Sequence, residues 1–89
     1  MDVKNLWTSV QQKLKGVFPK SIFNLYLNDN IVPIAINSNI LYLSGDNRSK
    51  EFFEKQQKET ILAAFDELAV NVKDIIVLTN DDTNDTGMN

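Results

Sequence analysis

The chain has 89 residues, 43% of them hydrophobic, which fits one globular domain with a modest core. It contains no Cys and no His, so disulfides, thiolate metal sites and the common nucleophile–base pairs of enzymes are excluded. The net charge is −3, and three acids near the end (Asp81, Asp82 and Asp85) account for it, leaving a neutral body that does not favour strong unaided binding to nucleic acid.

An amphipathic helix is predicted over residues 1–17. Its apolar residues follow the i, i+3/i+4, i+7 rule and fall within an arc of about 100°. Asp2 is the predicted N-cap, and Pro19 marks the exit from the helix. Trp7 and Leu6 lie at opposite edges of the arc, so the sequence leaves open whether Trp7 is buried in the core or offered to a partner. The arc consists of Val3, Leu6, Trp7, Val10, Leu14 and Val17.

A second, short helix is predicted to begin at Pro19, since the first turn of a helix does not need the missing N–H. Ile22, Phe23 and Tyr26 share one face of it. The segments 31–36 and 40–44 are rich in β-branched and other apolar residues and predict an antiparallel hairpin.

A third helix is predicted from Asn47 to about residue 68, capped by Asn47 or Ser49. Two acid–base pairs, Glu51–Lys55 and Glu54–Lys58, have the i,i+4 spacing that supports a helix. Phe52 points away from the inner face, so it is either covered by the hairpin or an exposed contact. The inner face consists of Phe53, Gln57, Ile61, Ala64, Phe65 and Leu68.

The segment 72–79 predicts a third strand, and residues 80–89 have the composition of a disordered polar tail. The order α-α-β-β-α-β predicts an α+β domain over residues 1–79, with a three-stranded sheet packed with helices. This order is similar to that of KH domains. However, the G-x-x-G loop with which KH domains read single strands does not occur in the sequence.

Residues that could support catalysis are scarce. The carboxylate pairs Asp66/Glu67 and Asp81/Asp82 are adjacent in sequence and are interpreted as solvated surface charge. With three Gly in the chain, the glycine-rich phosphate loops cannot be formed. We therefore expect no enzymatic activity, no cofactor and no metal in this segment. No signal-peptide pattern and no apolar run of about 18 residues occur, so we expect a cytoplasmic protein without a membrane partner.

Four motifs, in order along residues 3–79, resemble the N-terminal domain of the bacterial chromosomal replication initiator DnaA. A Leu-Trp pair lies in the first helix and a Phe-x-x-aromatic motif in the second. A hairpin follows, and then an Asn-Arg pair opens a helix with an aromatic on its inner face. In this sequence the motifs are Leu6-Trp7, Phe23-x-x-Tyr26, Asn47-Arg48 and Phe53.

The resemblance implies a KH-like fold and two interaction surfaces. The first is a self-association face that joins initiators at the origin, made of Leu6 and Trp7 with Val3 and Val10 as neighbours. The second is a docking surface for the replicative helicase or regulatory proteins. It includes Tyr26, Asn47, Arg48 and Ser49.

Three positions depart from the family pattern. Ser49 stands where an aromatic often follows Asn-Arg, Ile22 where an acid is frequent, and Asp46 where a proline is usual. Phe52, one turn after Ser49, is a candidate to supply the missing aromatic of the docking surface.

The resemblance also implies weak affinity for single-stranded DNA, and ATP binding in a separate domain of the full-length protein. The tail from residue 80 would then begin an interdomain linker. The alternative is a KH-like domain that binds single-stranded nucleic acid directly.

Overall fold

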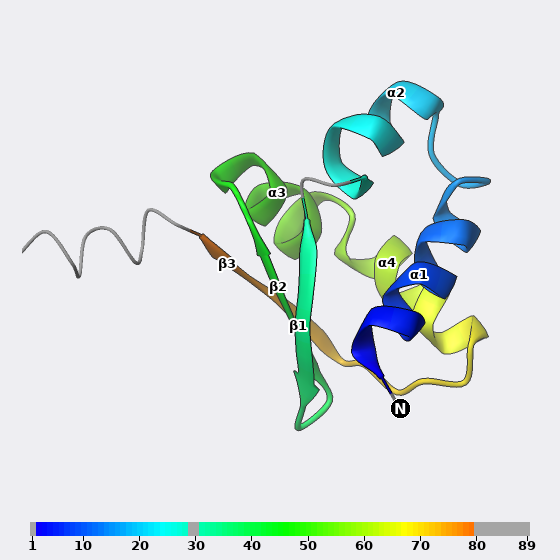
Figure 1. Cartoon of the computed structure of the whole chain (residues 1–89), viewed down its shortest axis with the longest axis vertical. Helices are drawn as coiled ribbons and strands as arrows, with labels where there is room; N and C mark the ends of the chain where they lie inside the picture. Colours follow the sequence, from blue (N-terminus) through cyan, green and yellow to red (C-terminus); the bar gives the residue numbers. More distant parts are fainter. Residues whose placement is uncertain (1, 29–30, 80–89) are drawn as a thin grey trace, which may run out of the picture.

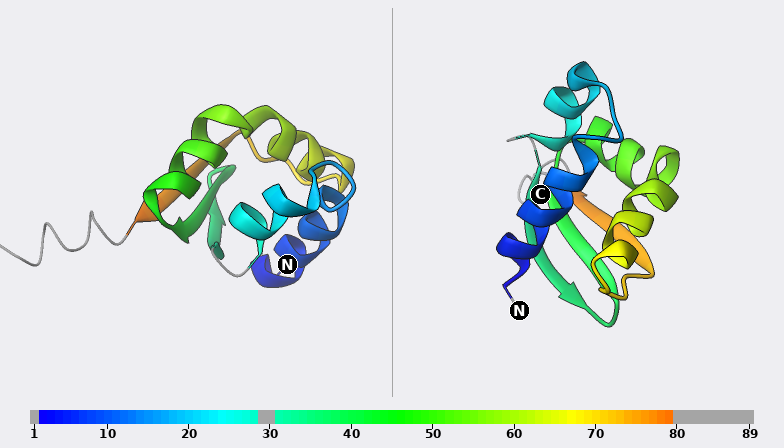
Figure 2. Two further views of the ribbon diagram at one scale, coloured as in Figure 1. Left: turned by 90° about the horizontal axis from the view of Figure 1, so that it is seen from above. Right: turned by 90° about the vertical axis from the view of Figure 1, so that its right-hand side faces the viewer.

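Helices cover one side of a three-stranded mixed sheet in a computed structural model that describes residues 2–28 and 31–79 (Figure 1). Figure 2 shows the helices gathered on that side. Four α-helices are present in the described ranges, and the predicted α+β class is confirmed. The similarity to KH domains stays a prediction, and the predicted tail lies outside the described residues.

The first helix, α1 (Val3–Leu14), begins as predicted. The Asp2 carboxylate accepts a hydrogen bond from the Lys4 backbone N–H at 3.1 Å and caps the helix. The helix ends at Leu14 instead of residue 17, because the backbone hydrogen bonds that follow span three residues instead of four. The Val17 N–H donates to the Leu14 carbonyl oxygen at 3.0 Å. This turn rotates Val17 outward. The prediction that Val17 continues the apolar face of the helix is therefore wrong, and its side chain is 56% exposed.

The second helical segment consists of α2 (Lys20–Ile22) and a π-helical turn, η1 (Phe23–Leu27). Pro19 takes the N-cap position and accepts the first backbone hydrogen bond, from Phe23 N–H at 2.9 Å. Phe23 and Leu27 are buried, and Tyr26 is half-buried.

The sheet has the order β1-β2-β3. The strands β1 (Val32–Asn37) and β2 (Ile40–Gly45) pair antiparallel, which confirms the predicted hairpin. Its tight turn places Ser38 and Asn39 at φ of 52° and 66°, the left-handed conformation that a type I′ hairpin loop requires at both of its central residues. The last strand, β3 (Asp74–Thr79), lies parallel to β2.

The predicted third helix is divided into α3 (Asn47–Glu51), a π-helical turn η2 (Phe52–Gln56) and α4 (Lys58–Glu67). Its N-cap is Asp46, not Asn47 or Ser49. A π-helical turn is wider than an α-helical one and shifts the phase of the side chains, so Phe52 and Phe53 are both buried.

The same shift changes the ion pairs. Lys50 pairs with Glu54 at 3.0 Å and Lys58 with Asp74 at 2.9 Å, in place of the two predicted pairs. None of the helices in residues 2–28 and 31–79 combines the length and apolar character that crossing a membrane requires.

Candidate interaction surfaces

The predicted self-association residues lie mostly in the core. The exposed fractions of Leu6, Trp7 and Val10 are 7%, 3% and 0%, while Val3 is half-buried. One side of α1 packs against β1 and another against α4, so both edges of its apolar arc are covered. The prediction that Leu6 and Trp7 form an exposed face of the single chain is therefore wrong.

Trp7 belongs to an aromatic cluster. The centroid of its ring is 6.0 Å from that of Phe53 and 6.3 Å from that of Phe65. The indole Nε1–H is buried and has no hydrogen-bond partner among the described residues. An unpaired buried donor costs free energy, so the contribution of Trp7 to the fold comes from the packing of its ring.

Two of the predicted docking residues form a stacked pair. The Tyr26 ring lies on the Phe52 ring, with centroids 4.2 Å apart and planes 4° from parallel. The rings of Phe18 and Phe53 also pack against the Phe52 ring, with centroid distances of 5.6 and 5.1 Å. Phe52 is 4% exposed, so the prediction that it is an exposed contact is wrong, and the rings of Phe18 and Tyr26 pack on it.

The other docking residues begin α3. Asn47 and Arg48 are exposed, whereas Ser49 is buried, and its N–H donates to Asp46 Oδ1 at 2.8 Å. This hydrogen bond, with the nearby charge of Arg48, lowers the pKa of Asp46 below its ordinary value. The surface left for a partner here consists of Asn47 and Arg48, and Ser49 is excluded by burial.

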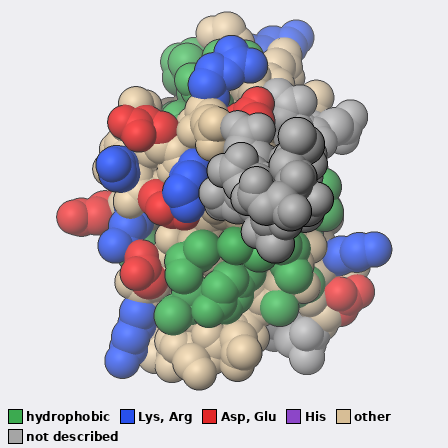
Figure 3. Space-filling view, turned by 90° about the vertical axis from the view of Figure 1, so that its left-hand side faces the viewer, with side chains coloured by type: hydrophobic (Ala, Val, Ile, Leu, Met, Phe, Trp, Pro, Cys, Tyr) green, Lys and Arg blue, Asp and Glu red, His purple; other side chains and the backbone are tan. Residues whose placement is uncertain are grey.

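A surface that was not predicted from the sequence is the side of the sheet that is left uncovered by the helices of residues 2–28 and 31–79. The strands alternate, with Leu41, Leu43, Ile75 and Val77 facing the helices and buried. The opposite side, here called the outer sheet face, is also apolar, and Figure 3 shows hydrophobic side chains gathered there. It consists of Val32, Ile34, Ala35 and Asn37 of β1, Ile40, Tyr42 and Ser44 of β2, and Asp74, Ile76 and Leu78 of β3.

The outer sheet face exposes large hydrophobic side chains. Val32, Ile34 and Leu78 are 50%, 46% and 46% exposed. A register shift between Pro33 and Ala35 makes Ile34 an extra residue of the bulged strand. Polar residues normally occupy an uncovered sheet face, so this one has the composition of a contact surface.

A signal for this face exists in the sequence. The strands carry apolar residues at both odd and even positions, as Ile40-Leu41-Tyr42-Leu43 shows. Such strands are typical of sheets covered on both faces. The predicted helices could cover one face only, so a second covering layer was indicated.

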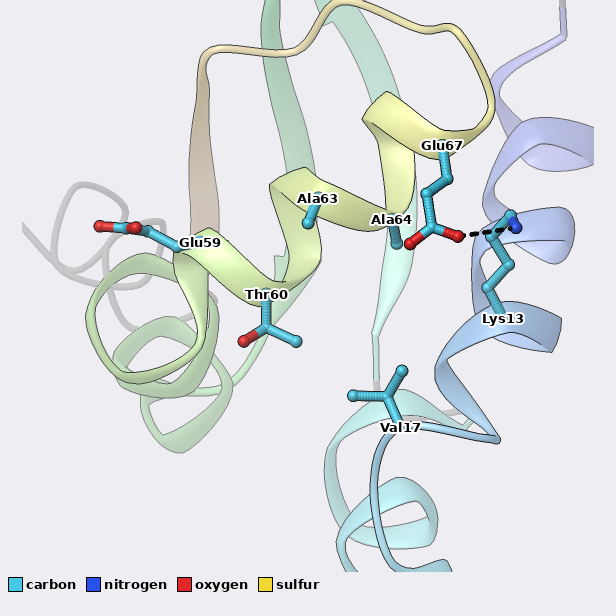
Figure 4. Close-up of a pocket in the computed structure, with 7 residues that line it drawn as sticks. All are labelled: Lys13, Val17, Glu59, Thr60, Ala63, Ala64 and Glu67. Carbon is cyan, nitrogen blue, oxygen red and sulfur yellow. Dashed lines mark hydrogen bonds and ion pairs between the residues drawn. The ribbon is translucent and has the colours of Figure 1, made fainter.

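Among the helices of the described residues, two grooves were examined as candidate ligand sites by their lining. Figure 4 shows the first, between the end of α1 and α4, where Lys13 and Glu67 point toward each other and form an ion pair at 3.2 Å. Its volume is about 590 Å³. Val17 and the alanines of α4 line it, and they offer little to orient a ligand. The lining residues are Lys13, Val17, Glu59, Thr60, Ala63, Ala64 and Glu67.

The second groove is basic. Lys15, Lys20, Phe23, Asn24 and Asn28 line it, and Lys15 Nζ lies 5.7 Å from the centroid of the Phe23 ring. Two ammonium groups beside an aromatic ring and two amides can contact phosphate and bases.

The described part of the chain contains no group of three or more Asp or Glu side chains placed to hold a metal ion. Neither models of known protein families nor curated protein sequences give a match to this chain.

Proposed function

We propose that the chain is a protein-interaction module of a chromosomal replication initiator. It would join initiator copies at the origin and recruit the replicative helicase or regulatory proteins. The sequence resemblance over residues 3–79 suggests this role, and the apolar outer sheet face is the structural observation that carries it. Three of the five large hydrophobic side chains most exposed in the described chain (Val32, Ile34 and Leu78) lie there.

The chemistry of this face favours protein binding over catalysis. Exposed apolar side chains in a contiguous group are the usual mark of a protein contact. Weak contacts suffice in an initiator, because copies tethered to the same DNA have a high local concentration. ATP binding would belong to another domain of the full-length protein, and the location would be cytoplasmic.

Recruitment of a helicase or regulator would use the docking residues that remain at the surface. Asn47 and Arg48 are exposed at the start of α3, and Tyr26 is half-buried. Leu6 and Trp7 are not available for this purpose without opening the core.

The experiment that tests the proposal is sedimentation equilibrium of the 89-residue chain over a rising concentration series. Reversible association that grows with concentration is expected. A chain that stays monomeric up to about 1 mM, where free energies of association near 4 kcal/mol become visible, contradicts self-association.

A second candidate function, direct binding of single-stranded DNA, is favoured by the basic groove around Lys15, Lys20 and Phe23. Fluorescence anisotropy with a labelled single-stranded oligonucleotide at several salt concentrations tests it. Tight binding that falls steeply with salt, and that Lys15→Gln with Lys20→Gln abolishes, would favour this function. Weak binding that the two substitutions leave unchanged would count against it.

A further inference from the structure

We propose that two copies of this chain associate by packing their outer sheet faces against each other, with Tyr42 of the central strand near a two-fold axis. The inference rests on the proposed function and names the surface and the partner for self-association. Side chains of β1, β2 and β3 would interdigitate as in a sandwich of two sheets.

The edge of β3 is closed to strand addition. The Val77 N–H donates to Glu54 Oε2 at 2.6 Å, and Lys50 Nζ donates to the Val77 carbonyl oxygen at 3.1 Å. The Ile75 N–H donates to Asp74 Oδ1 at 2.8 Å. Side chains therefore occupy both backbone groups of Val77 and the N–H of Ile75, which disfavours pairing edge to edge at the middle of this strand.

The edge of β1 is unsuited to strand addition for other reasons. Pro33 has no backbone N–H to donate to another strand, and the extra residue Ile34 interrupts the regular register. In addition, α1 packs beside β1. With both edges unsuited, the broad apolar face is the part of the sheet that remains for a contact.

The charges of the outer sheet face favour a second copy as the occupant. Its one charged side chain, Asp74, is paired with Lys58 at 2.9 Å. Two such faces bring no unpaired like charges together, whereas nucleic acid or a strongly charged peptide would find no complementary charge here.

The size of the face predicts a weak dimer. Three strands of six residues span roughly 20 Å by 14 Å, on the order of 300 Å² in projection. A stable interface buries about 800 Å² on each partner. Association would therefore need a high local concentration, which is the condition of initiators held on one DNA.

Leu78→Lys tests the inference, with Val17→Lys as its matched control. Both residues are exposed, at 46% and 56%, and both changes replace an exposed hydrophobic side chain with an ammonium group. Val17 lies in the α1–α4 groove, away from the sheet. Circular dichroism melting establishes that both variants fold.

In sedimentation equilibrium, Leu78→Lys is expected to raise the dissociation constant at least about tenfold, because two copies would bury unpaired ammonium groups. Val17→Lys is expected to associate like the wild type. If Leu78→Lys associates as the wild type does, the face-to-face dimer is overturned while the proposed function stands. A wild type that stays monomeric would overturn both the face-to-face dimer and the proposed self-association. If only Val17→Lys loses association, the interface lies at the α1–α4 groove and the face-to-face dimer is wrong.

An NMR dilution series gives a second readout that needs no variant. Amide shifts that depend on concentration should cluster in residues 40–44 and 74–79. If they cluster instead on the exposed positions of α1, such as Lys4 and Thr8, the interface is on the first helix and the inference is wrong.

Discussion

Tyr26 and Phe52 stack with ring centroids 4.2 Å apart and planes 4° from parallel, which joins the two π-helical turns η1 and η2. The contact covers a side chain that helical periodicity had assigned to the outside. It converts Phe52 from a candidate contact for partners into a core residue that fixes the second helical segment against the third.

Phe52→Ala is expected to lower the free energy of unfolding by about 3–5 kcal/mol, because it leaves a cavity among aromatic rings. Loss of the stacked pair contributes about 0.5–1.5 kcal/mol of aromatic pairing. Urea unfolding followed by circular dichroism measures the change. Tyr26→Phe is the control, since it keeps the ring and removes only the hydroxyl, and it should unfold close to the wild type. A fully stable Phe52→Ala variant would show that the ring is not part of the core.

Trp7→Ala is expected to destabilise the fold by about 3–5 kcal/mol, because the ring packs between Phe53 and Phe65. Trp7→Phe should cost much less, since it keeps an aromatic ring and removes the unpaired Nε1–H. Thermal melting of both variants provides the measurement. Concentration-dependent association that is lost in a normally stable Trp7→Ala variant would restore the exposed-face prediction.

Asp46→Ala is expected to lower the free energy of unfolding by about 1 kcal/mol at neutral pH, the usual value of a helix N-cap. The pKa of Asp46 is lowered in the folded state, first by the hydrogen bond from the Ser49 N–H. The extra stability is therefore present above the ordinary carboxyl pKa and is lost as the pH falls below about 4.

Urea unfolding at pH 7 and pH 3 checks this pH dependence. The difference between the wild type and Asp46→Ala should shrink at pH 3. Asp46→Asn keeps an acceptor without the charge and should differ from Asp46→Ala by the same amount at both pH values. An unchanged difference between the wild type and Asp46→Ala would mean that the carboxylate charge contributes nothing.

Glu54→Ala is expected to cost about 1–3 kcal/mol, because the Val77 N–H loses its acceptor and Lys50 its ion pair. It should also open the edge of β3 to pairing with other strands. Light scattering during incubation at a temperature below the melting transition should show increased aggregation. Glu54→Gln keeps an acceptor for the N–H, so it should aggregate less than Glu54→Ala. Equal aggregation of the two variants would exclude a protective role for this hydrogen bond.

The order of the elements, the hairpin and the Asp2 cap could be predicted from the amino-acid sequence. These depend on local properties: apolar periodicity, turn residues, and a carboxylate next to free N–H groups at a helix start. The resemblance predicted that Tyr26 and Phe52 contact a partner protein. In the structure the two rings stack on each other within the chain.

Which apolar side chains are buried depends on how the helices and strands pack against one another, and it could not be predicted from the sequence. Trp7 and Leu6 lie at the edges of one helical stripe, and their burial depends on β1 and α4, which pack on either side of it. The burial of Phe52 depends on the wide turn of η2. This turn shifts the direction of the side chains that follow, and the α-helical periodicity of 3.6 residues does not predict such a shift. The exposure of the outer sheet face depends on how many layers of helices cover the sheet. The strand pattern fits covering on two sides, but the helices of the described chain supply one layer, on one side of the sheet.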